Sequence, residues 1–139
     1  RIEFVRDLHG VLYYNDSKAT NPDAAIRGIG SMNRKTLLIG GGYDKNLEFD
    51  AWIESFDGKV KFLLLIGQTK DKIAVCARKH GFENIVCCDT LNEAVNICYR
   101  LAKPGEAVLL SPACASWGDF KDYTQRGELF RQYVMELPE

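Results

Sequence analysis

The sequence has little of what marks a membrane protein or a nucleic-acid-binding protein. Its longest apolar run, residues 62–66, is far shorter than the ~20 residues that a membrane-spanning helix needs. The chain does not start with a charged and then apolar signal segment. Lys and Arg number 18 against 19 Asp and Glu, and no block of like charge occurs. We therefore expect a cytoplasmic protein that binds neither membranes nor nucleic acid.

The patterns typical of disulfides and metal ions are also missing. The five cysteines are an odd number and contain no Cys-x-x-Cys pair, which argues against a disulfide framework and against a zinc site. We expect neither of the two histidines, His9 and His80, to lie near a cysteine, and we therefore expect no metal site made of side chains. The cysteines are interpreted as small apolar core residues in a reducing compartment.

What is present is the composition of one globular domain. The chain has 139 residues, of which 46% are hydrophobic and 27% charged, enough apolar mass for a sizeable core. It opens at Arg1 rather than Met, and we expect it to be a piece of a larger protein.

Short apolar runs alternate with helical periodicity along this chain. Two runs joined by a Gly-containing turn at 7–10 predict an antiparallel hairpin, and four later, continuously apolar runs predict a buried parallel sheet. The predicted strands are residues 2–6, 11–14, 36–39, 60–66, 85–88 and 107–110. The predicted helices are residues 22–32, 49–56, 71–80, 91–102 and 130–137. We expect an α/β fold with a Rossmann-like, doubly wound, mostly parallel sheet of about six strands and one antiparallel edge strand.

In such a sheet the ligand site lies outside the carboxyl ends of the strands, so the loops there carry the functional argument. The loop at 15–22 combines an acid, hydroxyls and an ammonium group. Thr20 or Asn21 is expected to cap the following helix. That structural role leaves residues 16–18 without an explanation, and we take them as functional candidates.

Two further loops share this edge of the predicted sheet. The loop at 40–45 has three glycines followed by Lys45, but it matches neither the Walker A pattern nor Gly-x-Gly-x-x-Gly. The loop at 111–117 holds Ser111, Cys114 and Ser116. No His lies in these loops to activate a nucleophile, so a polar clamp for an anionic ligand suits the residues better.

Five segments carry a resemblance to a known family. They are Asn-Asp-Ser-Lys-Ala-Thr-Asn-Pro at 15–22, Gly-Gly-x-Asp-Lys at 41–45, Leu-Leu-Ser-Pro-Ala-Cys-Ala-Ser at 109–116, Asp-Phe-Lys-Asp-Tyr at 119–123 and Arg-Gly at 126–127. In this order and spacing they resemble the C-terminal domain of the Mur ligases. Within this family the resemblance is strongest to the members that add D-glutamate. The resemblance covers the whole chain, residues 1–139.

The resemblance implies a three-domain, ATP-dependent ligase of which this chain is the glutamate ligase domain. The members that it resembles most join D-glutamate to UDP-N-acetylmuramoyl-L-alanine through an acyl phosphate in peptidoglycan precursor synthesis, with release of ADP and phosphate. ATP and Mg²⁺ would be bound mainly by a central domain that carries the phosphate loop. The isolated domain is accordingly expected to be inactive and to hold no catalytic residue.

Matching positions suggest individual roles for side chains of this chain. Lys45 resembles the lysine that pairs with a D-glutamate carboxylate. Ser116 resembles the serine whose hydroxyl and neighbouring backbone bind the side-chain carboxylate. Thr20 resembles a further contact to the amino acid. Trp117 and Tyr123 would form the pocket wall, where the family commonly has Leu and Phe respectively.

A second set of positions resembles the family's contacts to ATP, namely Arg1, Asp16 and Lys18. They would reach the nucleotide when the domain closes over it. Two alternatives stay open: the C-terminal domain of another Mur ligase or of a folylpolyglutamate synthetase, and a non-catalytic α/β module that binds nucleotides or anions.

Overall fold

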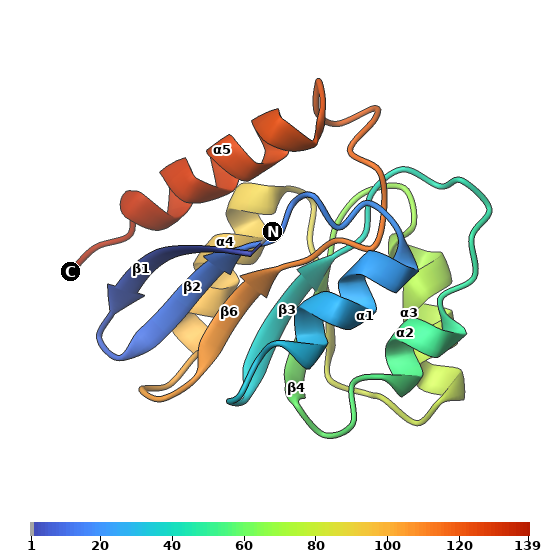
Figure 1. The fold of residues 1–139 in the computed structure, drawn as a ribbon, viewed down its shortest axis with the longest axis horizontal. Coiled ribbons are helices and arrows are strands. Elements are labelled where there is room, and N and C mark those ends of the chain that lie inside the picture. The colour runs from blue at the N-terminus through green and yellow to red at the C-terminus, as the bar shows by residue number, and fades with distance from the viewer. Residues whose placement is uncertain (1) are drawn as a thin grey trace.

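The computed structural model describes residues 2–139 and contains one sheet with helices on both faces (Figure 1). The strands are β1 (Glu3–Leu8), β2 (Val11–Asn15), β3 (Thr36–Gly40), β4 (Val60–Leu65), β5 (Ile85–Cys87) and β6 (Ala107–Leu110). Their order in the six-stranded sheet is β1-β2-β6-β3-β4-β5. β1 pairs antiparallel with β2 at one edge, and every other pair is parallel. The predicted fold class is confirmed.

The helices divide between the two faces of the sheet. They are α1 (Pro22–Gly30), α2 (Asp50–Glu54), α3 (Lys70–Lys79), α4 (Leu91–Leu101) and α5 (Tyr123–Met135). Leu38 and Leu109 pack on the face covered by α1, α2 and α3, whereas Leu37 and Val108 pack on the face covered by α4 and α5 (Figure 1). Successive strand residues point to opposite faces, so continuously apolar strands supply both cores.

The hairpin turn is tighter than the sequence indicated. β1 continues to Leu8, which leaves only His9 and Gly10 between the strands, with φ of 55° and 83°. Positive φ at both positions is the type I′ geometry, whose twist matches that of the flanking strands. Asp7 Oδ1 accepts the Gly10 N–H at 3.0 Å and fixes this turn.

The helix ends differ from the predicted ones, most of all in α2 and α5, whereas the cap of α1 is one of the two expected residues. Asn21 is the cap of α1 and accepts the Ala24 N–H at 3.0 Å. α2 is shorter than predicted, and α5 begins at Tyr123, capped by Asp122, seven residues before the predicted start. The earlier start was missed because the buried face of the first turns of α5 carries Arg126 and Gly127 rather than apolar side chains.

The cysteines are only partly core residues. Cys88, Cys98 and Cys114 are buried as expected, but Cys76 is half-buried and Cys87 is exposed. All five are free thiols. Among the described residues, no helix has both the length and the apolar character to cross a membrane.

Candidate functional site

Three neighbouring strands end in one row and start the three loops that the sequence singled out. β6 lies between β2 and β3, and Leu110 of β6 is in register with Asn15 of β2 and with Ile39 of β3. Because the three strands are parallel, their carboxyl ends open on the same edge of the sheet. Residues 16–21, 41–49 and 111–122 therefore leave the sheet side by side.

Backbone hydrogen bonds join these loops to one another. The Gly41 N–H donates to the Pro112 carbonyl at 2.9 Å, and the Tyr43 N–H donates to the Ala115 carbonyl at 3.0 Å. The Ala113 N–H donates to the Ala19 carbonyl at 3.0 Å. The loop after β6 is thus bonded to both of its neighbours, and the three loops form one connected layer.

Arg126 connects parts of this layer through buried hydrogen bonds. Its fully buried guanidinium donates from Nε to Ser17 Oγ at 2.9 Å, from Nη2 to the Ser17 carbonyl at 2.7 Å and from Nη1 to the Cys114 carbonyl at 3.0 Å. Ser17 Oγ in turn donates to the Tyr123 carbonyl at 2.7 Å. Burial lowers the pKa of Arg126 to about 10, so the group stays charged at neutral pH. It connects α5 to the loops after β2 and β6.

Asp16 is a buried carboxylate at the start of the first loop. Ser111 Oγ donates to its Oδ2 at 2.8 Å, and burial raises the pKa of Asp16 above 3.8 despite that bond. Helix α1 passes close by: a Cβ on Gly28 would lie 2.5 Å from Asp16 Oδ2 and 2.7 Å from Ser111 Oγ. A side chain at Gly28 would therefore displace the carboxylate.

A cavity of about 740 Å³ opens beside Asp16 and α1. Its lining includes the cationic side chains of Lys18, Arg27 and Arg34, together with Tyr14. One carboxylate and three cations are an unusual concentration of charge, and they suit a polyanionic ligand that also carries hydroxyl groups. Asp16 and Lys18 thus share a cavity, while Arg1, the third residue expected there, lies outside the described residues.

Lys45 and Trp117 meet on the other side of the loop layer. Lys45 Nζ lies 5.0 Å from the centroid of the Trp117 ring, a cation–π arrangement. The Tyr43 ring contacts Trp117 edge-on at 5.4 Å between centroids. Trp117 also lines a depression of about 450 Å³ that includes Lys70. Loops far apart in sequence therefore place a free ammonium group above an exposed aromatic ring.

The other expected amino-acid contacts lie in or next to the same layer, and the described residues show no hydrogen bond between them and Lys45. Ser116 is buried, and its carbonyl accepts the Phe120 N–H at 3.0 Å. The Tyr123 ring is exposed, at the start of α5. Thr20 is half-buried, next to Ala19, whose carbonyl is bonded to the third loop. None of these residues lines the cavity beside Asp16.

The thiol of Cys114, in the third loop, is not activated as a nucleophile. Burial raises the pKa of Cys114 to about 11, so its thiol is protonated at neutral pH. Its Sγ lies 3.5 Å from Thr69 Oγ1, which also accepts the Gly42 N–H at 3.0 Å. Cys114 and Thr69 therefore connect the second and third loops.

Sequence reasoning missed several residues that build the site. Arg27 and Arg34 lie on and after α1, outside the three loops, and Thr69 lies in a loop without a motif. Arg126 was part of a quoted motif but was given no role, although it precedes the buried Phe130 by four residues and therefore falls on the same helical face. The expectation that neither histidine lies near a cysteine is wrong for His80, which is grouped with Cys76 and Asp50.

Comparison with known proteins identifies the family. Residues 1–114 match the model described as Mur ligase, glutamate ligase domain. A UDP-N-acetylmuramoylalanine–D-glutamate ligase from Lachnoclostridium phytofermentans is 59% identical over 99% of this chain, and one from Lachnospira eligens is 56% identical over 99%. The chain spans about 30% of the length of each of these relatives.

Solved structures show the same fold at low sequence identity. A murein peptide ligase from Psychrobacter arcticus superposes with a TM-score of 0.65 and 14% identity, over 99% of this chain and 30% of that one. A domain from Haemophilus ducreyi, described as part of a putative UDP-N-acetylmuramate:L-alanyl-gamma-D-glutamyl-meso-diaminopimelate ligase, has a TM-score of 0.61 and 16% identity, over 96% of this chain and 99% of that one. With the match of residues 1–114, these findings show that the chain belongs to the Mur ligase family as its glutamate ligase domain.

Proposed function

We propose that this chain is the C-terminal, amino-acid-binding domain of a three-domain ligase that adds D-glutamate to UDP-N-acetylmuramoyl-L-alanine at the expense of ATP. The proposal is supported by relatives named as D-glutamate ligases at 59% and 56% identity. It is supported equally by the connected layer of three loops at the carboxyl edge of β2, β6 and β3. Such a reaction on a UDP-linked substrate takes place in the cytoplasm.

The amino-acid side of this layer suits a dicarboxylate. D-glutamate needs a cation and several hydrogen-bond donors for its two carboxylates. Lys45 is an exposed ammonium group, held over Trp117, that supplies the cation. The hydroxyl groups of Thr20 and Ser116 lie in the adjoining loops and supply donors. No side chain here has to act as a nucleophile, because the attacking amine belongs to the substrate.

The cavity beside Asp16 suits the phosphates and ribose of ATP. Lys18, Arg27 and Arg34 offer charge-assisted donors to phosphate oxygens, and the Asp16 carboxylate can accept from a hydroxyl group. ATP supplies the phosphoryl group that converts the substrate carboxylate into an acyl phosphate. The contribution of this chain would be to position the nucleotide and neutralise its charge, which dominates catalysis of phosphoryl transfer.

The one cluster of three potential metal ligands among the described residues does not suit Mg²⁺. This cluster consists of Asp50, Cys76 and His80. Mg²⁺ prefers six oxygen ligands, whereas this group offers sulfur and nitrogen. As the family resemblance implies, we assign Mg²⁺ mainly to the central domain of the proposed enzyme and derive no step from it here.

The direct test is an assay of the longer protein that contains this chain. Phosphate release in the presence of ATP, Mg²⁺ and UDP-N-acetylmuramoyl-L-alanine should depend on D-glutamate and should not be supported by L-glutamate or diaminopimelate. The 139-residue chain alone should release no phosphate. A preference for another amino acid, or turnover by the chain alone, would contradict the proposal.

A further inference from the structure

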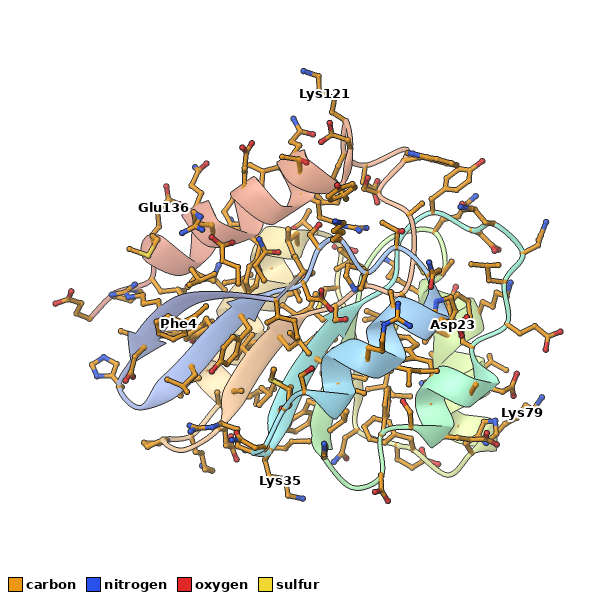
Figure 2. All side chains as sticks on the ribbon, viewed as in Figure 1. Phe4, Asp23, Lys35, Lys79, Lys121 and Glu136 are labelled. Carbon is orange, nitrogen blue, oxygen red and sulfur yellow. The ribbon has the colours of Figure 1, made fainter. Side chains whose placement is uncertain are left out.

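Helices α2 and α3 bring a carboxylate, a thiol and an imidazole together away from the loops described above. One ligand atom each from Asp50, Cys76 and His80 lies within 4.8 Å of the others. Cys76 lies on α3, and His80, four residues later, is the C-cap of that helix, so the two side chains lie on one side of it, while Asp50 begins α2. Figure 2 labels Lys79, the neighbour of His80, at the margin of the molecule where α3 lies beside α2. None of the three residues lines the cavity beside Asp16 or the depression beside Trp117.

We propose that Asp50, Cys76 and His80 form a binding site for a zinc-type divalent transition-metal ion. Thiolate sulfur, imidazole nitrogen and carboxylate oxygen are the three ligand types that Zn²⁺ takes in proteins. Their mixture excludes Mg²⁺ and Ca²⁺, which require oxygen ligands. With three protein ligands, a water molecule completes the tetrahedron. Binding displaces the Cys76 thiol proton to solvent, so the site gains one cation and loses one proton.

The distances require only small side-chain movements. His80 Nε2 and Asp50 Oδ1 are hydrogen-bonded at 2.8 Å. Around tetrahedral Zn²⁺, with bonds of ~2.1 Å, ligand nitrogen and oxygen atoms stand about 3.4 Å apart. The two groups must therefore separate by less than about 1 Å. Both side chains are partly exposed, so rotation about their χ angles supplies that movement without shifting a helix.

The second nitrogen of His80 has a carboxylate partner. His80 Nδ1 lies 3.7 Å from Glu54 Oε2. When Nε2 of a histidine binds a metal, Nδ1 donates to such a group, which fixes the orientation of the ring and raises its basicity. Glu54 is the last residue of α2 and lies four residues after Asp50. Helix α2 thus provides the ligand Asp50 and also Glu54, which would orient the ligand His80 at the end of α3.

The ion can reach these ligands from solvent. Asp50 and Cys76 line a depression of about 320 Å³, together with Lys72 and Lys79. Lys72 is already paired with Asp44 at 3.2 Å. A Cys76 thiolate with the Asp50 and Glu54 carboxylates provides three negative charges against the two positive charges of the ion. Bound metal would connect α2 to α3 next to residues 46–49, which follow Lys45.

The test is a Co²⁺ titration of the full chain under reducing conditions. Co²⁺ replaces Zn²⁺ and gives a thiolate-to-cobalt charge-transfer band together with intense visible bands when four-coordinate. We expect one equivalent to give both signals and Zn²⁺ to abolish them by displacement. Cys76→Ser should remove the charge-transfer band. Cys87→Ser, which changes the exposed cysteine on β5, is the matched control and should leave the spectrum unchanged.

Two further variants distinguish the proposed metal ligand His80 from Glu54, which would only orient its ring. His80→Ala should weaken Co²⁺ binding more than Glu54→Gln, which should weaken it about 10-fold, because Glu54 acts only through His80. Zn²⁺ should raise the Tm of the unmodified chain and leave that of Cys76→Ser unchanged. Absence of the charge-transfer band in the unmodified chain would overturn the proposal, and Asp50 and His80 would then form a hydrogen bond without binding metal. Persistence of the band in Cys76→Ser or its loss in Cys87→Ser would also overturn the proposal.

Discussion

The buried base of the candidate site and its exposed rim hold their residues in different ways. In the base, formed by Asp16, Ser17, Ser111 and Arg126, each side chain is buried and hydrogen-bonded to another loop or element. In the rim, formed by Lys45, Trp117 and Tyr123, the rings are 54% and 41% exposed. Lys45 is held there by a single cation–π contact. Mutations in the base should therefore act on stability, and mutations at Lys45 on ligand affinity.

The largest effect is expected for Arg126→Met. This change leaves the Ser17 and Cys114 carbonyls buried without donors and loses three charge-assisted bonds. We expect a loss of about 3 kcal/mol or more in the free energy of unfolding. Urea denaturation of the chain measures it.

Arg126→Lys is the control, since it keeps the charge but cannot make the forked set of bonds. It should restore little of the lost stability. A loss below about 1 kcal/mol for Arg126→Met, the range of an ordinary substitution, would show that the loops are held together without this residue.

Lys45→Ala should behave in the opposite way. Under the proposed function, the change would remove a charge-assisted bond to D-glutamate worth roughly 1.5–3 kcal/mol and raise KM for the amino acid about 10- to 150-fold in the complete enzyme. Because Lys45 is exposed, the free energy of unfolding should change by no more than about 0.5 kcal/mol. KM for ATP should stay the same. Steady-state kinetics with each substrate varied in turn decide this, and an unchanged KM for D-glutamate would remove Lys45 from the site.

Gly28→Ala tests the packing between α1 and the base. The new Cβ would lie 2.5 Å from Asp16 Oδ2, and overpacking of this kind costs about 1–3 kcal/mol. Gly30→Ala in the same helix is the matched control, because nothing lies within 4 Å of its Cβ position. Thermal unfolding should show a lower Tm for the first variant only. Equal Tm values would mean that Asp16 moves aside without cost.

Asp16→Asn gives the smallest effect, and its sign depends on pH. Burial raises the pKa of Asp16 in the folded chain, so ionised Asp16 opposes folding. Protonated Asp16 makes its full contribution to the free energy of unfolding at pH values below the pKa of the unfolded chain. This contribution is lost as the pH rises through the higher pKa of the folded chain. The Asn variant, whose amide oxygen can still accept from Ser111, should therefore be the more stable protein near neutral pH. Its advantage should vanish on acidification, as urea titrations from roughly pH 7 to pH 3 would show.

The fold followed from the sequence because its signals are local. Apolar runs such as 107–110 indicate strands by themselves, and the Asn21-Pro22 pair marks the start of α1. The site followed less completely, because its contacts join distant residues. Lys45 and Trp117 could be named as candidates from their motifs, but their contact depends on how two loops pack. The spacing of Cys76 and His80 in a predicted helix was a signal for their grouping that the sequence prediction missed, whereas the approach of Asp50 depends on the packing of α2 on α3.

The most direct test of the central claim, that three loops form one surface for an acidic amino acid, is an NMR titration of the chain with D-glutamate. Binding by an exposed site should be weak, with a Kd of ~1 mM or higher. The amide shifts should be confined to residues 43–46, 115–118 and the neighbouring 17–20, with smaller changes for L-glutamate. Shifts spread over other surfaces, or shifts in one loop without the other two, would contradict it.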